Sequence, residues 1–478
     1  MRDARVAVVG LGTSGRAAAE VLLTLGARPA GFDAREEAAE AARADGIEAR
    51  AVADPAALAE AVLAAGPDLV VVSPGVPSHA PLYRLASAAG IPVWSEVELA
   101  WQVQAPRADG SFAPWLTLTG TNGKTTTVTM ASEILQAAGL DAPAVGNVGT
   151  PIVRVAAQGA VDVMAVELSS FQLHATFSVE PLASACLNVA PDHIDWHGSL
   201  EAYIADKARV YDRTLLACAY NLADPVTRRM VDGASPAPGA RIVGVGLGAP
   251  AAGELGVHDG VLTDRAFVSP PGEAVLATVD DLAHLAPGGA GTIPGHILAD
   301  ALFAAALTRA YGVSPAAVRD GLRAHQPGAH RIALVRTVGG VRWVDDSKAT
   351  NAHAAEASLL ALPPGSVVWM AGGLAKGARF DDLVEHVRDR LRGVVLIGVD
   401  REPMRSALER HAPEVPRFEV VVADHGEVMR QAVAAALRLA RPGDTVLMAP
   451  ACASMDQFVS YAHRGDAFTR AVEELGSE

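Results

Sequence analysis

Short apolar runs that end in glycine-rich or polar turns recur along the chain, and most precede a segment whose apolar residues have helical spacing. The first run, VAVVG, enters GLGTSG at residues 10–15, then a predicted helix and a second strand that ends at Asp33. A further run over Leu69–Val72 ends in SPG at 73–75. Strands that alternate with helices in this way predict a parallel sheet of the α/β class, with ligand-binding loops beyond the carboxyl ends of the strands.

A second block begins with LTLTGTNGKTTT at Leu116–Thr127, an apolar run that enters a glycine-rich loop and then a predicted helix. The strand VDVMAVE ends at Glu167, and the strand ASACLNV leads into Asp192 and His193. A stretch rich in Gly and Pro with weak strand signals follows at 235–291. After it, IPGHILADALFAAALTRAYG predicts one long amphipathic helix.

The third block contains the apolar runs WVDD, VVWMAGG, VVLIG and TVLMAPA, each followed by a polar loop and separated by helical segments. This pattern predicts a second doubly wound sheet. A chain of 478 residues exceeds what one hydrophobic core usually supports. We therefore expect an α/β protein of three domains: a Rossmann-like domain at 1–108, a central P-loop domain at 109–327 and a second Rossmann-like domain at 328–478.

Composition narrows the functional class. The formal net charge of −15 argues against nucleic-acid binding, which requires a basic surface. The three cysteines form no CxxC pair, which favours a reducing compartment and predicts neither a zinc site nor a disulfide. The sequence shows no signal peptide and no apolar run of membrane-spanning length. We expect a soluble cytoplasmic protein, without membrane insertion, that acts on small molecules.

The glycine-rich loop of the second block indicates ATP chemistry. In a P-loop, Gly120 and Gly123 let backbone N–H groups approach phosphate oxygens and Lys124 reaches the β- and γ-phosphates, while Thr125 or Thr126 can bind Mg²⁺. The alternative is an ordinary glycine turn before a helix. Such a turn does not require a lysine directly after glycine, followed by a hydroxyl.

Two residues at strand ends are candidates for a metal site. An acid at the end of a buried strand beside a P-loop is the usual partner of Mg²⁺, and Glu167 stands at such a position. A surface acid that merely ends a strand would look the same. A lone loop histidine such as His193 is usually a surface residue, so its spacing alone assigns it no role.

The loop at 10–15 together with Asp33 fits the dinucleotide-binding fingerprint. Taken alone, the fingerprint predicts an NAD(P)-dependent oxidoreductase or a sugar-nucleotide dehydrogenase. A half-Rossmann domain can equally bind the diphosphate of another nucleotide, and the oxidoreductase hypothesis leaves the P-loop and the third block unexplained. A non-catalytic nucleotide-binding regulator is a further alternative.

Several motifs, in this order and spacing, resemble the Mur ligases: GTNGKTT, the strand end ELSS, NVAPDH, Tyr203-x-x-x-Lys207 and His330-Arg331. The resemblance covers all three predicted domains. It implies a ligase that uses ATP to convert a substrate carboxylate into an acyl phosphate, which an amine then attacks. Within the family, DDSKATN, PACASMDQF and GLGTSG imply UDP-N-acetylmuramoyl-L-alanine and D-glutamate as substrates, in peptidoglycan precursor synthesis. A sibling ligase that adds a different amino acid is the alternative.

The resemblance also implies ATP and Mg²⁺ as cofactors, and we expect a monomer. Its catalytic residues would be Lys124, Glu167, His193 and Lys207, with Lys207 carbamylated. The metal ligands would be Thr125, Glu167, His193 and the carbamate of Lys207; on spacing alone, Lys207 is better explained as an exposed helical lysine. The implied ATP contacts are Gly120, Thr121, Asn122, Gly123, Lys124, Thr125, Thr126, Asn221, Arg331 and Asp346.

The implied contacts of the two other substrates lie in the first and third domains and around the P-loop. For the UDP-linked substrate they are Gly12, Thr13, Ser14, Gly15, Asp33, Arg35, Ser73, Pro74, Gly75, Asn147 and His193. For D-glutamate they are Lys348, Thr350, Lys376, Ser454 and Tyr461. The chain departs from many relatives at Leu374-Ala375, where a more polar pair is common, and from some relatives at Tyr461, where they have Phe.

Overall fold

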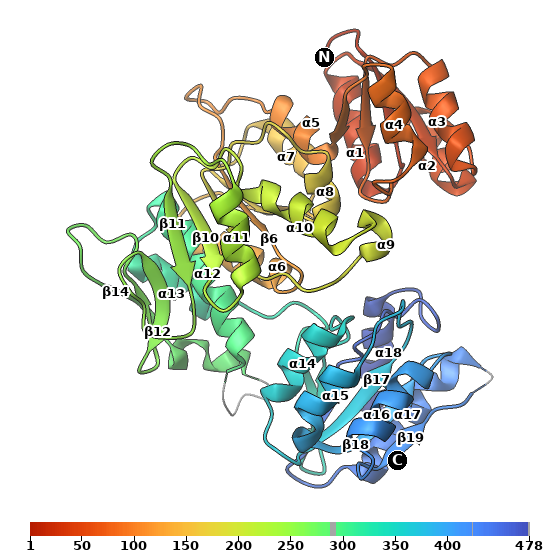
Figure 1. Cartoon of the computed structure of the whole chain (residues 1–478), viewed down its shortest axis with the longest axis vertical. Coiled ribbons are helices and arrows are strands. Elements are labelled where there is room, and N and C mark those ends of the chain that lie inside the picture. Colours follow the sequence, from red (N-terminus) through yellow and green to blue (C-terminus); the bar gives the residue numbers. More distant parts are fainter. Residues whose placement is uncertain (287–292, 423, 477–478) are drawn as a thin grey trace. The chain divides into compact units, whose positions relative to one another are not determined.

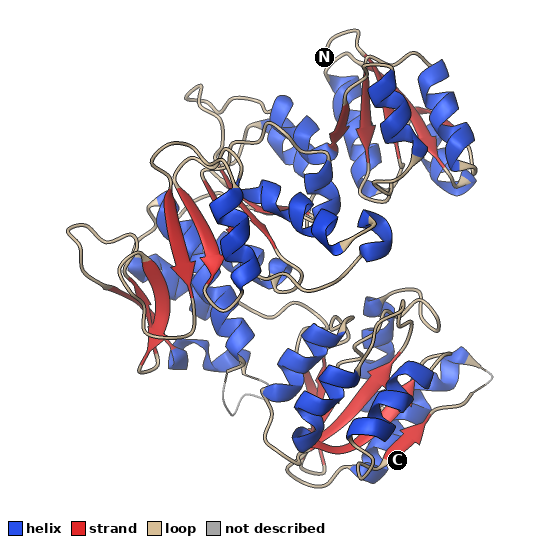
Figure 2. Cartoon of the chain, in the orientation of Figure 1, coloured by secondary structure: helices blue, strands red, loops and turns tan. Residues whose placement is uncertain are grey.

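The computed structural model describes residues 1–286, 293–422 and 424–476, which fold into three helix-flanked sheets (Figures 1 and 2). The chain packs into two compact units. The first unit comprises Met1–Thr278 and Ala299–His325 and holds two sheets, and the second comprises Val279–Leu298 and Gln326–Glu478 and holds one. The prediction of an α/β protein with three sheet-containing domains is confirmed.

The first sheet has five parallel strands in the order β3-β2-β1-β4-β5. Its strands are β1 (Arg5–Val9), β2 (Arg28–Asp33), β3 (Glu48–Ala51), β4 (Leu69–Val72) and β5 (Val93–Ser95), and its helices are α1 (Thr13–Thr24), α2 (Glu36–Ala44), α3 (Pro55–Ala64), α4 (Pro81–Ala88) and α5 (Glu96–Gln102). The strand order reverses direction between β1 and β4. In a doubly wound sheet this switch point is where ligands bind, and the GLGTSG and SPG loops follow these two strands.

The second sheet has nine strands in the order β14-β13-β12-β11-β10-β9-β6-β8-β7. They are β6 (Trp115–Thr119), β7 (Ala144–Gly146), β8 (Met164–Glu167), β9 (Ala183–Cys186), β10 (Ala217–Asn221), β11 (Arg241–Val245), β12 (Glu254–His258), β13 (Val261–Asp264) and β14 (Ala274–Thr278). The strands from β7 to β12 run parallel, so the carboxyl ends of β8, β6 and β9 are neighbours at one edge. The P-loop follows β6, Glu167 is the last residue of β8, and the loop that ends in His193 follows β9.

The helices of this region are α6 (Lys124–Ala137), α7 (Ile152–Gln158), α8 (Ser170–His174), α9 (Ile194–His197), α10 (Leu200–Ala208), α11 (Pro225–Gly233), α12 (Gly295–Tyr311) and α13 (Pro315–Ala324), with short 3₁₀ turns at Arg209–Tyr211 and Val279–Leu285. The stretch with weak strand signals forms β11 to β14, and its residues 287–291 lie outside the described residues. The prediction that α12 is amphipathic is wrong. Every side chain from Asp300 to Thr308 is buried, which is the pattern of a helix covered on all sides.

The third sheet has six strands in the order β15-β16-β20-β17-β18-β19, all parallel except β15. Its strands are β15 (Ala333–Val338), β16 (Val341–Asp345), β17 (Val367–Gly372), β18 (Leu391–Ile397), β19 (Arg417–Glu419) and β20 (Thr445–Met448), and its helices are α14 (Ala352–Leu360), α15 (Asp381–Val387), α16 (Glu402–His411), α17 (Val428–Leu439) and α18 (Tyr461–Glu473), with 3₁₀ turns at Arg388–Arg390 and His425–Glu427. The loops after the adjacent strands β16, β20 and β17 carry DDSKATN, PACAS and GGLAKG. Parallel strands therefore bring these three motifs to one edge.

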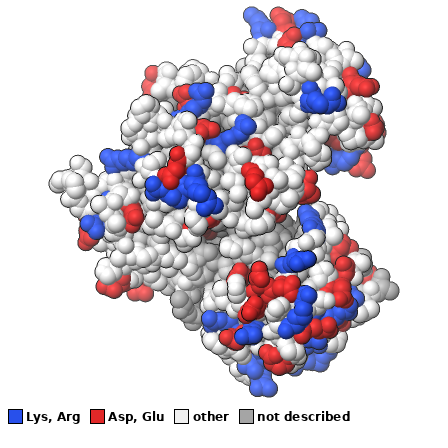
Figure 3. All heavy atoms as spheres, in the orientation of Figure 1, with Lys and Arg blue, Asp and Glu red and all other residues white. Residues whose placement is uncertain are grey.

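Surface charges are mixed on the face drawn in Figure 3, where acidic and basic side chains alternate over both units. None of the helices in the described part of the chain combines the length and the apolar character needed to cross a membrane. The three cysteines are buried free thiols.

Candidate active site

The glycine loop after β1 leaves one open face. Gly10 has a positive φ of 88°, and a Cβ on Gly15 would overlap the carbonyl oxygen of Gly10, so both positions need glycine for packing. A Cβ on Gly12 would meet nothing within 4 Å. Thr13 and Ser14 follow in the first turn of α1, whose N-terminus favours an anion. An approaching phosphate would therefore meet backbone N–H groups beside Gly12.

Asp33 and Ser73 hold this loop in place from the ends of β2 and β4. The Asp33 carboxylate accepts hydrogen bonds from Leu11 N at 2.7 Å and Arg35 N at 2.9 Å. Burial opposes the charge of Asp33, but these hydrogen bonds and Arg35 hold its pKa below the usual value. Ser73 Oγ donates to Gly10 O at 2.6 Å, and Pro74 and Gly75 follow it in the same loop. The structure thus gathers the residues predicted for the UDP-linked substrate in the first sheet at one edge.

The P-loop has the backbone form that its glycines predict. Gly123, at the N-cap of α6, has a positive φ of 83°, and a Cβ there would overlap the carboxylate of Asp300. Lys124 Nζ folds back and donates to Gly120 O at 2.8 Å and Thr121 O at 2.9 Å. Thr125 and Thr126 lie in the first helical turn. Lysine, hydroxyls and helix N-terminus therefore share one location.

Asn188, which follows β9, fixes the conformation of the P-loop. Its Oδ1 accepts hydrogen bonds from Thr121 N at 3.1 Å and Asn122 N at 2.9 Å, and its Nδ2 donates to Asn122 O at 3.1 Å. We did not predict Asn188 as a site residue, although it opens the NVAPDH motif. The nearby Asp300 was also missed, because its place inside a long apolar helix suggests core packing.

Lys207 is buried in α10 with only 2% of its surface exposed, so its interpretation as an exposed helical lysine is wrong. Its Nζ donates to Gly120 O at 2.7 Å and lies 3.4 Å from Thr119 Oγ1. Gly120 O is also an acceptor for Lys124, so two lysine nitrogens converge on one carbonyl oxygen. Burial, and then the neighbouring Lys124 charge, lower the pKa of Lys207 to about 7.

The two carboxylate oxygens of Glu167 differ in their hydrogen bonding. Its Oε1 accepts a hydrogen bond from Asn147 Nδ2 at 2.9 Å, while Asn147 N donates to Glu167 O at 2.9 Å. Its Oε2 is buried and has no hydrogen-bond partner among the described residues. A buried carboxylate oxygen without a donor is costly unless a cation binds it. Glu167 therefore fits a hard cation such as Mg²⁺.

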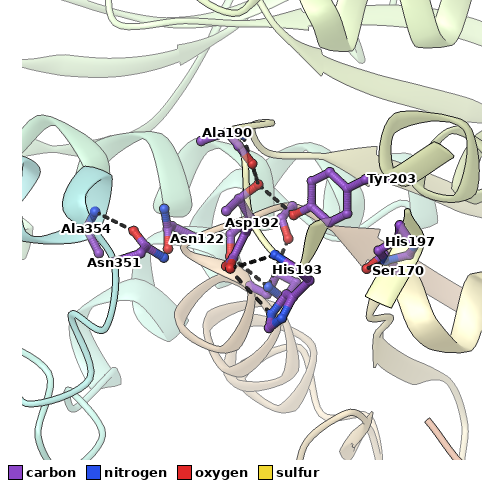
Figure 4. A network of polar contacts seen from close by, with 12 residues as sticks. Asn122, Ser170, Ala190, Asp192, His193, His197, Tyr203, Asn351 and Ala354 are labelled. Carbon is purple, nitrogen blue, oxygen red and sulfur yellow. Dashed lines mark hydrogen bonds and ion pairs between the residues drawn. The ribbon is translucent and has the colours of Figure 1, made fainter. Parts of the chain in front are cut away.

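His193 lies at the start of α9 with a positive φ of 53°, and its side chain is 43% exposed. Figure 4 shows it with Asp192, whose carboxylate Oδ2 lies 3.6 Å from His193 Nε2. Tyr203, from α10, shares a hydrogen bond of 2.9 Å with Thr121 Oγ1, which ties α10 to the P-loop. Over the described ranges, no group of three His, Cys, Asp or Glu side chains is arranged to hold a metal ion. A Mg²⁺ site here would therefore need hydroxyl, carbamate or water ligands as well.

A second polar cluster underlies the His193 segment and was not predicted. Asp206 bridges two histidines, with Oδ2 2.9 Å from His197 Nδ1 and both oxygens 3.0 Å from His174 Nδ1. His197 Nε2 lies 2.9 Å from Ser170 Oγ. The cluster joins three helices near the predicted site: α8 begins three residues after Glu167, α9 begins directly after His193, and α10 contains Lys207. Its residues are too far apart in the chain for spacing to suggest that they meet.

In the second unit, two aspartates follow β16. Asp346 is buried and accepts hydrogen bonds from Ser358 Oγ at 2.6 Å and Ile332 N at 3.3 Å, and burial raises its pKa to about 7. Asp345 is bonded to His330 Nδ1 at 2.6 Å. Arg331 acts electrostatically on Asp346. The predicted nucleotide contacts Arg331 and Asp346 are thus neighbours.

The residues predicted to bind the amino acid come from three loops of the same unit and from the first residue of α18. Lys348 Nζ lies 3.8 Å from the centre of the Tyr461 ring. Lys376 lines a cavity of about 690 Å³ beside the loop after β17. Ser454 is buried in the loop after β20, and Thr350 N donates to Lys348 O at 2.8 Å. The structure therefore brings Lys348 to Tyr461, and it places Lys376 and Ser454 in the loops after β17 and β20, two of the strands that form the same edge.

Asn221 and Leu374 each make hydrogen bonds within the protein. Asn221 uses both ends of its side chain inside the protein: Nδ2 donates to Leu187 O at 2.8 Å and Oδ1 accepts from Ala223 N at 2.8 Å. Leu374 does not disturb the backbone of its loop. Its N–H donates to Ala453 O at 2.9 Å, and its carbonyl oxygen accepts a hydrogen bond from Ala453 N at 3.1 Å. The departure at this position therefore does not displace the backbone that leads to Lys376.

The whole chain contains only four lysines, Lys124, Lys207, Lys348 and Lys376, and the other 35 of its 39 basic side chains are arginines. All four lysines are predicted site residues. Arginine cannot replace the compact ammonium of lysine at a close contact and cannot form a carbamate. This count was available in the sequence and is an independent signal for the site.

Family models match three parts of the chain. The match at residues 4–95 is to the Mur ligase MurD-like N-terminal domain, that at 118–269 to the Mur ligase middle domain, and that at 330–452 to the Mur ligase glutamate ligase domain.

Curated relatives and solved structures extend these matches. A UDP-N-acetylmuramoylalanine–D-glutamate ligase of Streptomyces coelicolor is 52% identical over 99% of this chain and 98% of its own length, and one of Thermobifida fusca is 50% identical over 99% of both. A pseudomurein peptide ligase type C from Methanothermus fervidus has a TM-score of 0.58 at 15% identity, covering 98% of this chain and 99% of its own. MurF ligase from Thermotoga maritima in complex with ADP has a TM-score of 0.53 at 16% identity, covering 99% and 96%. These two structures are similar in fold.

Proposed function

The chain belongs to the Mur ligase family, and we propose that it joins D-glutamate to UDP-N-acetylmuramoyl-L-alanine with ATP, in peptidoglycan precursor synthesis. The observation that carries this proposal is the match over nearly the full length to ligases named for this reaction. We also propose that the protein is a cytoplasmic monomer that acts on small molecules without a nucleic-acid partner. Its formal net charge of −15 supports the absence of a nucleic-acid partner.

Both chemical steps concentrate negative charge, and this chain supplies fixed donors for it. In the first step a terminal carboxylate of the UDP-linked substrate attacks the γ-phosphate of ATP, the bond to ADP breaks and an acyl phosphate forms. Lys124 and the first-turn N–H groups of α6 would hold the phosphates in line. In the second step the amine of D-glutamate attacks the acyl carbon, loses a proton, and phosphate leaves.

Mg²⁺, when bound, would neutralise phosphate charge during the first step. The unpartnered Oε2 of Glu167, with Thr125 and His193, would hold it. Lys207 is proposed to complete the set as a carbamate, because a second ammonium at the Gly120 carbonyl would repel a metal ion. In carbamate formation the neutral amine nitrogen bonds to the carbon of CO₂ and releases a proton. The burial that lowers the pKa of Lys207 favours that neutral amine.

We expect that turnover depends on D-glutamate, with L-glutamate, D-aspartate and meso-diaminopimelate poor substitutes. The reason is that Lys348, Thr350 and Ser454 would bind two carboxylates at a fixed separation, which leaves only one direction for the amine. The measurement is phosphate release from ATP in the presence of UDP-N-acetylmuramoyl-L-alanine and each amino acid in turn. Equal turnover with L-glutamate or with meso-diaminopimelate would contradict the specificity.

Changing Lys348 to Ala is expected to raise the KM for D-glutamate by roughly 10- to 100-fold, the size of one lost charge-assisted hydrogen bond. Binding of an ATP analogue, measured by calorimetry, should survive. Exposed Arg379 provides the matched control, because Arg379→Ala removes a positive charge from the same unit without touching the predicted contacts. Loss of ATP-analogue binding in Lys348→Ala would assign Lys348 to the nucleotide instead.

A further inference from the structure

Arg464, in the first turn of α18, is completely buried at 0% exposure, although its side chain is charged. Its guanidinium donates three hydrogen bonds: Nε to Ser347 Oγ at 3.0 Å, Nη2 to Ser347 O at 2.9 Å and Nη1 to Cys452 O at 3.1 Å. All three acceptors are neutral oxygens, and within the described residues no carboxylate lies at ion-pair distance from Arg464. Burial lowers the pKa of Arg464 to about 10.

The acceptors belong to the loops that carry the predicted amino-acid contacts. Ser347 directly precedes Lys348, and Cys452 lies two residues before Ser454. Ser347 Oγ also donates to Tyr461 O at 2.7 Å, so the bond network includes the start of α18. The guanidinium of Arg464 therefore connects the chain segments that contain Lys348, Ser454 and Tyr461.

A third loop passes directly over the same guanidinium. A Cβ on Gly373 would lie 3.3 Å from Arg464 Nη1, and Gly373 leads through the loop to Lys376. Gly465, the next residue along α18, packs against His330, because a Cβ at Gly465 would overlap the His330 ring. The carbonyl oxygen of His330 in turn accepts a hydrogen bond from Lys348 N at 3.1 Å. The turn that contains Arg464 is thus packed against every segment that positions a predicted amino-acid contact.

Folding alone does not favour such a residue. Removing a charge from water without a charged partner is unfavourable, and a packed apolar side chain of similar volume is often as stable or more so. A guanidinium differs from an apolar side chain, and from lysine, in presenting several donors at fixed angles in one plane. At this position its planar fork donates hydrogen bonds to Ser347 and Cys452, which belong to two different loops.

We propose that Arg464 is a positioning residue for the amino-acid site, which holds the loops of Lys348, Ser454 and Lys376 at the separation that two substrate carboxylates require. This role depends on the proposed function in one respect only, namely that the amino acid is D-glutamate. Arg464 acts through these loops and contacts no predicted substrate atom.

The test compares Arg464→Lys and Ser347→Ala with the wild type. Arg464→Lys keeps the positive charge but loses the planar fork, and Ser347→Ala removes one acceptor while leaving the guanidinium in place. Both should raise the KM for D-glutamate, Arg464→Lys by about tenfold or more, while the KM values for ATP and the UDP-linked substrate stay within about twofold. The matched control is Arg470→Lys on the exposed side of the same helix, which should leave all three KM values unchanged.

The outcomes separate this proposal from its premise. Wild-type KM for D-glutamate in folded Arg464→Lys and Ser347→Ala, or an equal rise of all three KM values, would overturn the positioning role. If Arg464→Lys fails to fold, as judged by its thermal transition, Ser347→Ala alone decides. If the wild type turns over with another amino acid and not with D-glutamate, the proposed function fails, and the same comparison with that amino acid still tests Arg464.

Discussion

Methionine in place of Lys124 is expected to lower kcat about 1,000-fold, which corresponds to about 4 kcal/mol of transition-state stabilisation, while the fold survives. Lys124 Nζ already lies against the carbonyl oxygens of Gly120 and Thr121 at the N-terminus of α6. In this position an ammonium can follow the charge that develops on the transferred phosphoryl group. Methionine has a similar length but no charge, so the loss would be electrostatic rather than steric.

Arginine at position 124 sharpens this test, because it keeps the charge and changes the shape. The loop closes around a single nitrogen that is within 2.9 Å of two carbonyl oxygens, and a planar guanidinium does not fit such a contact. We expect Lys124→Arg to be nearly as inactive as Lys124→Met in phosphate release. Retention of a tenth of wild-type kcat by Lys124→Met, with an unchanged thermal transition, would exclude Lys124 from phosphoryl transfer.

Local patterns in the sequence predicted the P-loop, the glycine loop of the first domain and the strand end at Glu167, and the family resemblance supplied the other site residues. An apolar run followed by glycines and a helix identifies a strand, its loop and the helix N-terminus, and parallel strands place such loops at one edge. Gly123 and Glu167 were found in this way. The long helix α12 was found too, but we expected it to be amphipathic, whereas its side chains from Asp300 to Thr308 are all buried.

Local spacing gave no information on residues that act through tertiary contacts. Arg464 was missed, and the spacing around Lys207 suggested an exposed helical lysine, although the family resemblance named it as a site residue. Lys207 meets Gly120 from 87 residues away, and Arg464 meets Ser347 from 117 residues away. The sequence around Lys207 does not indicate that it contacts Gly120, and the sequence around Arg464 does not indicate that it contacts Ser347. The Asp206 cluster likewise depends on three separate helices. For Lys207, the small number of lysines in the chain offered a further signal, but this count identifies positions without telling which atoms they contact.

Alanine in place of Lys207 is expected to remove most activity, and acetate is expected to restore part of it. The substitution would remove the side chain that reaches Gly120 O and Thr119 Oγ1 and leave a space beside the P-loop. If the native group is a carbamate, an added carboxylate can occupy this space and present the same charge to Mg²⁺. We expect a loss of at least 100-fold in kcat, about 2.7 kcal/mol, and a partial, saturable recovery with acetate.

Lys207→Arg is the matched control for this rescue. Arginine fills the space that acetate would need and cannot react with CO₂, so it should be inactive with or without acetate. The modification itself is measured by the carbon NMR signal of the wild type in ¹³C-bicarbonate. With four lysines in the chain, this signal can be assigned by its loss in Lys207→Ala and its retention in Lys348→Ala and Lys376→Ala. An active Lys207→Ala enzyme, or a carbamate signal that survives this substitution, would show that the buried amine works unmodified or that another lysine carries the carbamate.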